Sequence, residues 1–161
     1  MAVRRMIGRH TAQMDSRGRI SFPAAFRAAI GETLYLSPDL DRIGYLVARS
    51  EDEFNAEYDE LEQAVREASQ NIPGRTARER IEAQSKARWR MRQFTGRTVQ
   101  LSPDGSGRIT LPAELVTYAG LHGQVLVIGM GMSAEIWDEE VYRVAESAYE
   151  SGEYEQTQGN P

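Results

Sequence analysis

Two short stretches of this sequence place an aspartate four residues before an arginine, with a glycine directly before that arginine. The six residues are Asp15, Gly18, Arg19, Asp104, Gly107 and Arg108. Aspartate accepts hydrogen bonds from the amides of a turn and glycine adopts positive φ, so each stretch predicts a tight turn. An arginine guanidinium is a planar fork of donors that fits a phosphate group or the edge of a guanine. The chemistry that these residues indicate is therefore anion or base recognition.

The arginine of each turn allows two interpretations. In one, Arg19 or Arg108 forms an ion pair with the aspartate of its own turn and only locks the backbone. In the other, the arginine faces DNA and the aspartate orients it. The two are compatible, because an arginine held by a carboxylate is already oriented for a partner. Arg17, at the exposed part of the first turn, is expected to contact phosphate rather than a base.

We expect no catalytic residue in this chain. It has no cysteine and only two histidines, His10 and His122, and neither stands near a motif serine. Gly129-Met130-Gly131 lacks the third glycine of a dinucleotide-binding loop. The acidic residues fall on amphipathic helix faces rather than in a cluster with the spacing of metal ligands. No metal, cofactor or small-molecule substrate is expected either.

The two turns belong to an internal repeat that must position them. Residues 15–31 and 104–120 are related by an offset of 89 positions, and seven of the 17 residue pairs are identical. In each copy a strand leads through the turn into a second strand, a proline, a short helix and a glycine. Two more strands follow, so each copy is a ββαββ unit. Because a unit of about 40 residues is too small to be stable alone, we expect the copies to bury each other's faces as a pseudo-twofold barrel.

The expected elements follow from the pattern of apolar residues and turn residues. The first two strands of each copy are expected to pair as a hairpin, and so are the last two. The short helices begin at Pro23 and Pro112 and end at Gly31 and Gly120, which suit the first helical position and the C-terminal cap. The strands are Thr11–Met14, Arg19–Phe22, Leu34–Leu36 and Gly44–Val47 in the first copy, and Val99–Leu101, Arg108–Leu111, Gln124–Ile128 and Ala134–Trp137 in the second.

A helical hairpin is predicted between the copies. Ser50 with Glu53, and Thr76 with Glu79, have the spacing of capping boxes, and Pro73-Gly74 separates the two helices. The first helix carries an apolar stripe at helical spacing, which consists of Phe54, Tyr58, Leu61, Val65 and Ala68. The second helix is expected to end at about Gln93. A third helix is expected at Glu139–Tyr149, followed by a disordered tail from Glu150.

Charge is segregated along the chain, although the net charge is only -5. Residues 1–31 and 75–97 carry net charges of +5 and +6, whereas residues 51–67 and 135–161 carry -7 each. Such a protein can present a basic face to phosphate while its acidic helices point elsewhere. The longest apolar run, Val125–Ile128, is far shorter than the roughly 20 residues that cross a bilayer. We therefore expect no membrane partner and a cytoplasmic location.

The twin motifs, their separation, and the second-copy string YAGLHGQVLVIGMGMSAEIWDEEVY resemble the MraZ family over residues 5–150. The resemblance implies an α+β fold, a tandem AbrB-like swapped-hairpin β-barrel of pseudo-twofold ββαββ repeats with a helical hairpin insert. It divides the chain into two SpoVT-AbrB domains, a hairpin linker, and a C-terminal helix with a disordered acidic tail. The corresponding ranges are 8–54 and 97–141 for the domains, 55–96 for the linker and 142–161 for the C-terminal part.

The same resemblance implies a function. The protein would be a bacterial transcriptional regulator that binds direct repeats in double-stranded DNA upstream of the division and cell-wall gene cluster, associates with the nucleoid and assembles into a homo-oligomeric ring. Its DNA-binding residues would be Arg17, Arg19 and Arg108, with Asp15, Asp104, Gly18 and Gly107 orienting the motif. Arg9, in the basic N-terminal stretch, is a further candidate DNA contact, either as part of an arm that touches DNA or as part of a solvated terminus. The second turn has no counterpart of Arg17, so the two turns are expected to contribute unequally. Two alternatives stay open: a protein-interaction module of the antitoxin type, and an oligomer whose basic faces only hold subunits together.

Overall fold

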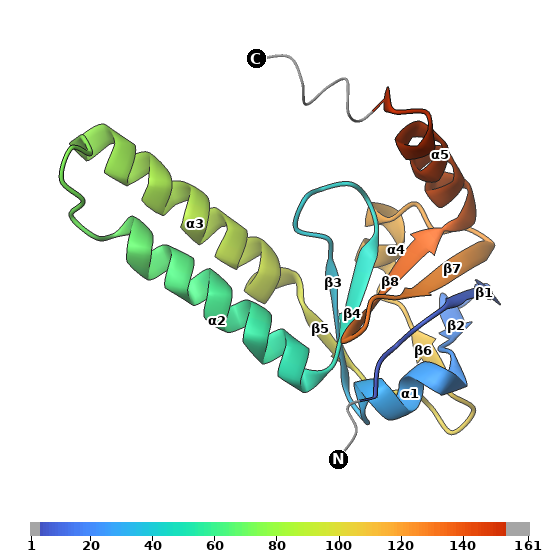
Figure 1. Ribbon diagram of the computed structural model, residues 1–161. Helices are drawn as coiled ribbons and strands as arrows, with labels where there is room; N and C mark the ends of the chain where they lie inside the picture. Colours follow the sequence, from blue (N-terminus) through green and yellow to red (C-terminus); the bar gives the residue numbers. More distant parts are fainter. Residues whose placement is uncertain (1–3, 154–161) are drawn as a thin grey trace.

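The computed structural model describes residues 4–153, which form an α+β fold with antiparallel sheets (Figure 1). The strands are β1 (Arg9–Gln13), β2 (Arg19–Ser21), β3 (Leu34–Pro38), β4 (Leu46–Arg49), β5 (Val99–Leu101), β6 (Arg108–Thr110), β7 (Gln124–Gly129) and β8 (Ser133–Asp138). The helices are α1 (Ala24–Ile30), α2 (Glu51–Ala68), α3 (Ala77–Arg97), α4 (Ala113–Tyr118) and α5 (Glu139–Glu150). The expected α+β class is confirmed.

The two copies share their sheets instead of each forming its own. One sheet has six strands in the order β1-β7-β8-β4-β3-β5, and β2 pairs with β6 in a separate two-stranded sheet. The first strands of the two copies, β1 and β5, lie at the edges and pair with β7 and β3 of the opposite copy. The expected hairpin between the first two strands of each copy is therefore wrong. The pairs β3–β4 and β7–β8 form as expected.

Burial explains why the first two strands separate after the turn. Ile20 of β2 and Ile109 of β6 lie opposite each other across the small sheet, and both are at most 1% exposed. Pairing β2 with β6 places both side chains in one core and leaves β1 and β5 to cover edges of the other copy's strands. A local turn signal does not report such long-range pairing. The AbrB-like swapped-hairpin barrel and the domain boundaries stay predictions.

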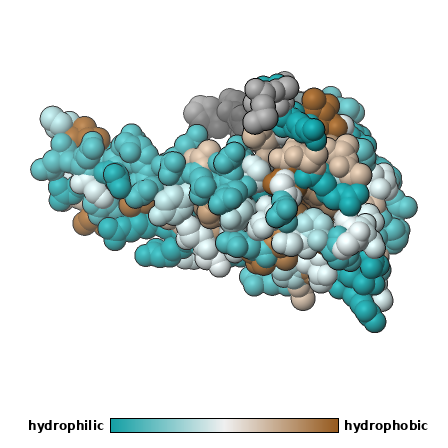
Figure 2. All heavy atoms as spheres, turned by 90° about the horizontal axis from the view of Figure 1, so that it is seen from below, coloured by the Kyte–Doolittle hydropathy of each residue, from teal (hydrophilic) through white to brown (hydrophobic). Residues whose placement is uncertain are grey.

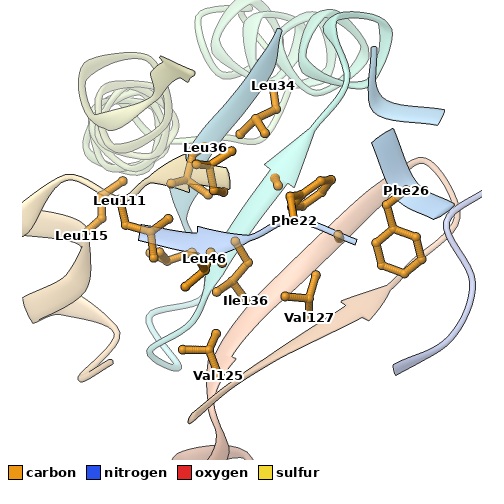
Figure 3. Close-up of a cluster of buried hydrophobic side chains, with 14 of the residues drawn as sticks. Phe22, Phe26, Leu34, Leu36, Leu46, Leu111, Leu115, Val125, Val127 and Ile136 are labelled. Carbon is orange, nitrogen blue, oxygen red and sulfur yellow. The ribbon is translucent and has the colours of Figure 1, made fainter. Parts of the chain in front are cut away.

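A single hydrophobic core joins the copies (Figure 3). The side chains come from β-strands, α1, α4 and the segments that follow β2 and β6, and none of those labelled in Figure 3 is more than 3% exposed. They are Phe22, Phe26, Leu34, Leu36, Leu46, Leu111, Leu115, Val125, Val127 and Ile136. Because both copies supply this core, neither copy has a complete core of its own.

The helices α2 and α3 form an antiparallel pair that projects from the sheet on the side away from β2 and β6 (Figure 1). The side chain of Ser50 accepts a hydrogen bond from the backbone N–H of Glu53 at 3.2 Å, which caps α2. Thr76 and Glu79 form the complete reciprocal capping box at the start of α3. Both helices therefore begin where the sequence signals place them.

The helix pair is largely hydrophilic on the outside, as Figure 2 shows. Leu61 and Ala68 of the apolar stripe are buried, and the other three stripe residues are half-buried. The second helix, α3, runs on to Arg97, one turn beyond the expected end at Gln93. The stripe is thus mostly used to hold α2 against α3.

The ends of the remaining helices stay close to their sequence signals. Pro23 and Pro112 stand at the N-cap, one position before α1 and α4, and Gly31 closes α1 with φ 89°. Asp138 caps α5 by accepting hydrogen bonds from amides of its first turn. The expected start of a disordered tail at Glu150 is wrong, because Glu150 is the last residue of α5; the part of the tail beyond residue 153 lies outside the described residues. No helix within residues 4–153 is long and apolar enough to cross a membrane.

Candidate nucleic-acid interface

Asp15 fixes the turn between β1 and β2 through three hydrogen bonds. Its Oδ1 accepts from the backbone N–H groups of Arg17 and Arg19, both at 2.9 Å, and its Oδ2 accepts from Nε of Arg19 at 2.7 Å. Gly18, with φ 75°, donates its backbone N–H to the carbonyl of Asp15 at 3.1 Å. Positive φ of this kind is unfavourable for a residue with a Cβ. One carboxylate thus holds both the backbone of the turn and the arginine that follows it.

Asp104 builds the second turn in the same way. Its Oδ1 accepts from the backbone N–H groups of Ser106 at 2.8 Å and Arg108 at 3.0 Å, and its Oδ2 accepts from Nε of Arg108 at 3.3 Å. Gly107 has φ 79°. The two turns therefore differ in the side chain at their tip, where Ser106 stands in place of Arg17.

Both aspartates are held in the charged form. The backbone N–H of Arg19 lowers the pKa of Asp15, and the backbone N–H of Arg108 lowers the pKa of Asp104; the guanidinium groups act in the same direction. The ion-pair interpretation of the motif is therefore confirmed. Each pair uses only Nε of the arginine, and within residues 4–153 the terminal nitrogens of Arg19 and Arg108 have no partner. An anchored guanidinium with free donors fits a phosphate or a guanine edge.

The strands β2 and β6 join the two turns in one structure, which we call the β2–β6 ribbon. The ribbon comprises residues 15–21 and 104–110. Its register places Arg19 opposite Thr110 and Arg108 opposite Ser21. Residues directly opposite each other share a face of an antiparallel pair, so these four side chains lie on one face, while the central isoleucine pair is buried on the other. A two-stranded ribbon is one of the elements that the major groove of DNA admits.

Two further arginines lie beside the turns. Arg17 is exposed at the tip of the first turn. Arg27, on α1 of the first copy, packs on the second turn so closely that a Cβ at Gly107 would collide with its guanidinium. Local sequence patterns do not indicate Arg27 as a site residue, because nothing local links α1 to the second turn. The only available signal is the repeat alignment, in which Arg27 corresponds to Val116.

Arg9 lies at the start of β1 and is held by α5. Its guanidinium donates to the carboxylate of Glu146 at 2.9 Å and to the hydroxyl of Tyr142 at 3.1 Å, and it lies 4.9 Å above the Tyr142 ring. The structure does not bring Arg9 into contact with either turn. DNA binding by Arg9 is therefore untested, and its contacts with α5 favour a structural role.

The two histidines have structural surroundings. His10 packs edge-on against Phe26, with ring centroids 4.9 Å apart. His122 is exposed, with Nδ1 lying 3.0 Å from the carbonyl of Gly120 and 3.2 Å from Oδ2 of Asp138. Across residues 4–153, no group of three or more histidine, aspartate or glutamate side chains is placed to hold a metal ion.

The sequence of this chain is similar to a known protein family and to several of its members. A family model described as "MraZ protein, putative antitoxin-like" matches residues 94–158, which contain the second turn and β6. The protein "Transcriptional regulator MraZ" of Paenarthrobacter aurescens is 32% identical over 136 residues, which cover 84% of this chain and 82% of that protein. This chain belongs to the MraZ family. The resemblance stated from the sequence is thereby confirmed.

Other MraZ relatives match to a similar degree. "Transcriptional regulator MraZ" of Kocuria rhizophila is 33% identical over 132 residues, covering 82% of this chain and 80% of that protein. The protein of the same name from Mycolicibacterium smegmatis is 32% identical over 146 residues, covering 89% of this chain and 88% of that protein. The similarity to MraZ proteins thus extends over most of the chain and includes more than the segment matched by the family model.

Proposed function

We propose that this chain is a sequence-specific, DNA-binding transcriptional regulator, and that the β2–β6 ribbon is its DNA-reading element. The relatives named as transcriptional regulators support the first part of the proposal. The single observation that carries the second part is the exposed face of the ribbon, on which Arg19 and Arg108 are each anchored by an aspartate. Catalysis is no part of this function.

The ribbon would act as a preorganised pair of arginines. Arg19 and Arg108 occupy diagonal positions on its exposed face, so that each meets DNA at a different point along the groove. The aspartates hold Nε and leave the terminal nitrogens to donate. A bidentate contact with a guanine discriminates against a wrong base by about 1–3 kcal/mol. Arg17 adds a phosphate contact, and each phosphate contact contributes about -0.9 to the slope of log Kobs against log salt concentration.

The finer part of the proposal concerns the target and the assembly. Following the family resemblance, the chain binds direct repeats upstream of the division and cell-wall gene cluster as a ring of copies, in the cytoplasm at the nucleoid. A single ribbon binds one short element weakly, whereas a ring facing several repeats gains affinity through effective concentration when the repeat spacing fits the subunit spacing. Lengthening the spacer by half a helical turn should therefore weaken binding much more than adding a full turn.

The test compares Arg19→Ala with Arg66→Ala. Arg66 lies on α2, away from the ribbon, and pairs with Glu62 at 2.8 Å. Fluorescence anisotropy with an upstream duplex and a random-sequence duplex, over a series of salt concentrations, measures binding, and sedimentation velocity measures assembly. Arg19→Ala should lose the upstream duplex and keep the oligomer, and Arg66→Ala should behave as the parent. If Arg19→Ala binds with unchanged affinity and salt slope, the ribbon is not the reading element.

The same measurements separate the two alternatives. The antitoxin-type interaction module has one observation in its favour, the description of the family model, and it predicts no preference for the upstream duplex over the random one. A purely structural oligomer predicts assembly without binding of either duplex. Sedimentation of an 18.1 kDa monomer alone at micromolar concentration would contradict the ring.

A further inference from the structure

Arg27 connects the first copy of the repeat to the turn of the second copy. It lies in the last turn of α1, and its guanidinium rests against the α-carbon of Gly107, in the space that a Cβ would fill. Because Gly107 carries no side chain, the guanidinium can approach the backbone of the turn directly. The charge of Arg27 is therefore placed at the ribbon, although its helix belongs to the opposite half of the chain.

The guanidinium of Arg27 has no hydrogen-bond acceptor or carboxylate partner within residues 4–153, and Arg27 is half-buried. The other arginines of the described part that are buried or half-buried all have a side-chain partner. These are Arg19, Arg49, Arg80, Arg97 and Arg108. Arginine stays protonated in proteins, and a partly desolvated cation is stabilised by an opposite charge. An unpaired guanidinium in this position has donors that can bind an anionic ligand.

The repeat alignment shows what Arg27 replaces. The first turn has Arg17 at its tip and Val116 of α4 beside it, and an open hollow of about 560 Å³ lies between them. The second turn has Ser106 at its tip and Arg27 of α1 beside it. Each turn thus carries one arginine besides that of its motif, but the two reach the ribbon from different elements.

The geometry points to Arg27 as a DNA-phosphate contact of the second turn, which takes over there the role that Arg17 has at the first turn. This inference rests on the proposed function. It bears on the expectation that the two turns contribute unequally, because it gives the second turn an arginine although that turn has no counterpart of Arg17. The two turns carry the same number of arginines and differ in where the phosphate lies, because Arg27 approaches from the side of α1 and Arg17 from the tip.

Three variants and a control test the contact. Arg27→Gln removes the charge and keeps a polar side chain, Arg27→Lys keeps the charge, and Arg143→Gln removes a cation from α5 that pairs with acidic residues of the same helix. Anisotropy with a random-sequence duplex, over a series of KCl concentrations, gives the salt slope. The salt slope of Arg27→Gln should be shallower than that of the parent by about 0.9 for each chain that contacts DNA. Arg27→Lys and Arg143→Gln should keep the parent slope. Adding Ser106→Arg to Arg27→Gln should restore the slope.

The outcomes separate this inference from the proposed function. Suppose that Arg27→Gln has the melting temperature and the salt slope of the parent, while Arg17→Gln has a shallower salt slope. Arg27 is then not a phosphate contact, and the proposed function stands. If the parent binds neither the random nor the upstream duplex, the proposed function fails and the inference fails with it. Should Arg27→Gln not fold, phenylglyoxal modification of the parent decides. DNA should then protect Arg27 and not Arg143, and equal modification of Arg27 with and without DNA overturns the contact.

Discussion

The backbone N–H of Phe22 donates to the carbonyl of Gly107 at 3.0 Å, although the two residues belong to different copies of the repeat. The reciprocal bond runs from the N–H of Leu111 to the carbonyl of Gly18 at 2.8 Å. Each turn glycine therefore has two structural roles. It adopts the positive φ of its own turn, and its carbonyl accepts the hydrogen bond at the end of the β2–β6 pair that joins the copies. This relationship makes the two glycines a sensitive point of the ribbon.

Gly18→Ala and Gly107→Ala should have different consequences. Both impose a Cβ at positive φ and should each lower the free energy of unfolding by about 1–3 kcal/mol. At Gly18 the new Cβ lies 3.2 Å from the carbonyl oxygen of Leu111, a backbone atom that cannot move away easily. At Gly107 it meets the mobile end of Arg27, which swings away. Urea unfolding should thus show Gly18→Ala as the less stable variant.

DNA binding provides the complementary measurement for the glycine variants. At equal folded concentration, Gly107→Ala should show a shallower salt slope than Gly18→Ala, because only the former displaces Arg27 from the ribbon. Equal slopes for the two variants would mean that the position of Arg27 on Gly107 is irrelevant to binding.

The aspartates of the turns should make stability depend on acid pH. The pKa of Asp15 and the pKa of Asp104 are both lowered in the folded chain, chiefly by the backbone N–H groups of Arg19 and Arg108. A lowered folded-state pKa stabilises the fold above the unfolded-state value of about 3.9 and loses this contribution as the pH falls through the folded-state value. Asn at both positions keeps the acceptor and removes the charge. Urea titrations should therefore show a flatter decline below about pH 4 for the double Asn variant; an identical decline would contradict the role of these carboxylates.

Arg9→Ala should affect α5 and leave DNA binding unchanged. The guanidinium pairs with Glu146 across a partly exposed contact, and such pairs contribute about 0.2–1 kcal/mol. Proteolysis or hydrogen exchange of α5 should increase slightly, while affinity for the upstream duplex and the salt slope stay at parent values. A shallower slope for Arg9→Ala would instead support the DNA-binding arm that the basic N-terminal sequence allows.

Phe94→Ala should be among the most destabilising substitutions on the helix pair. Phe94 is 0% exposed, stacks on Phe54 with ring centroids 4.9 Å apart, and lies 5.1 Å below the guanidinium of Arg49. Removing such a buried ring costs about 3–5 kcal/mol. Trp89→Ala on the same helix is the control, since Trp89 is 52% exposed and should cost about 1 kcal/mol or less. Similar losses for both variants would contradict a special contribution of the buried Phe94 ring to stability.

Features encoded by neighbouring residues could be predicted from the sequence. The capping box of Thr76 and Glu79 and the anchored arginines of both turns depend on spacings of three or four residues, and the structure shows them as expected. The order of strands along the chain has the same local origin. These signals need no knowledge of the rest of the fold.

The partners of distant segments could not be predicted in this way. The turn after β1 looks like an ordinary hairpin, whereas the pairing of β2 with β6 buries Ile20 and Ile109 together, which no local signal reports. Arg27 and Arg9 illustrate the same limit at the site. One rests on Gly107 and the other on α5, and both contacts depend on how the two halves are packed.

The pairing of β1 with β7 has a consequence for a nascent chain. Arg9 lies opposite Ile128, so β1 leaves the ribosome before its partner has been translated, by an interval on the order of ten seconds at ordinary elongation rates. Helices α2 and α3 make local contacts and can form within that interval. The strand β2, which follows the turn with Arg19, has no pairing partner until β6 has been translated. We therefore expect a nascent chain to gain its DNA-binding surface only near the end of translation.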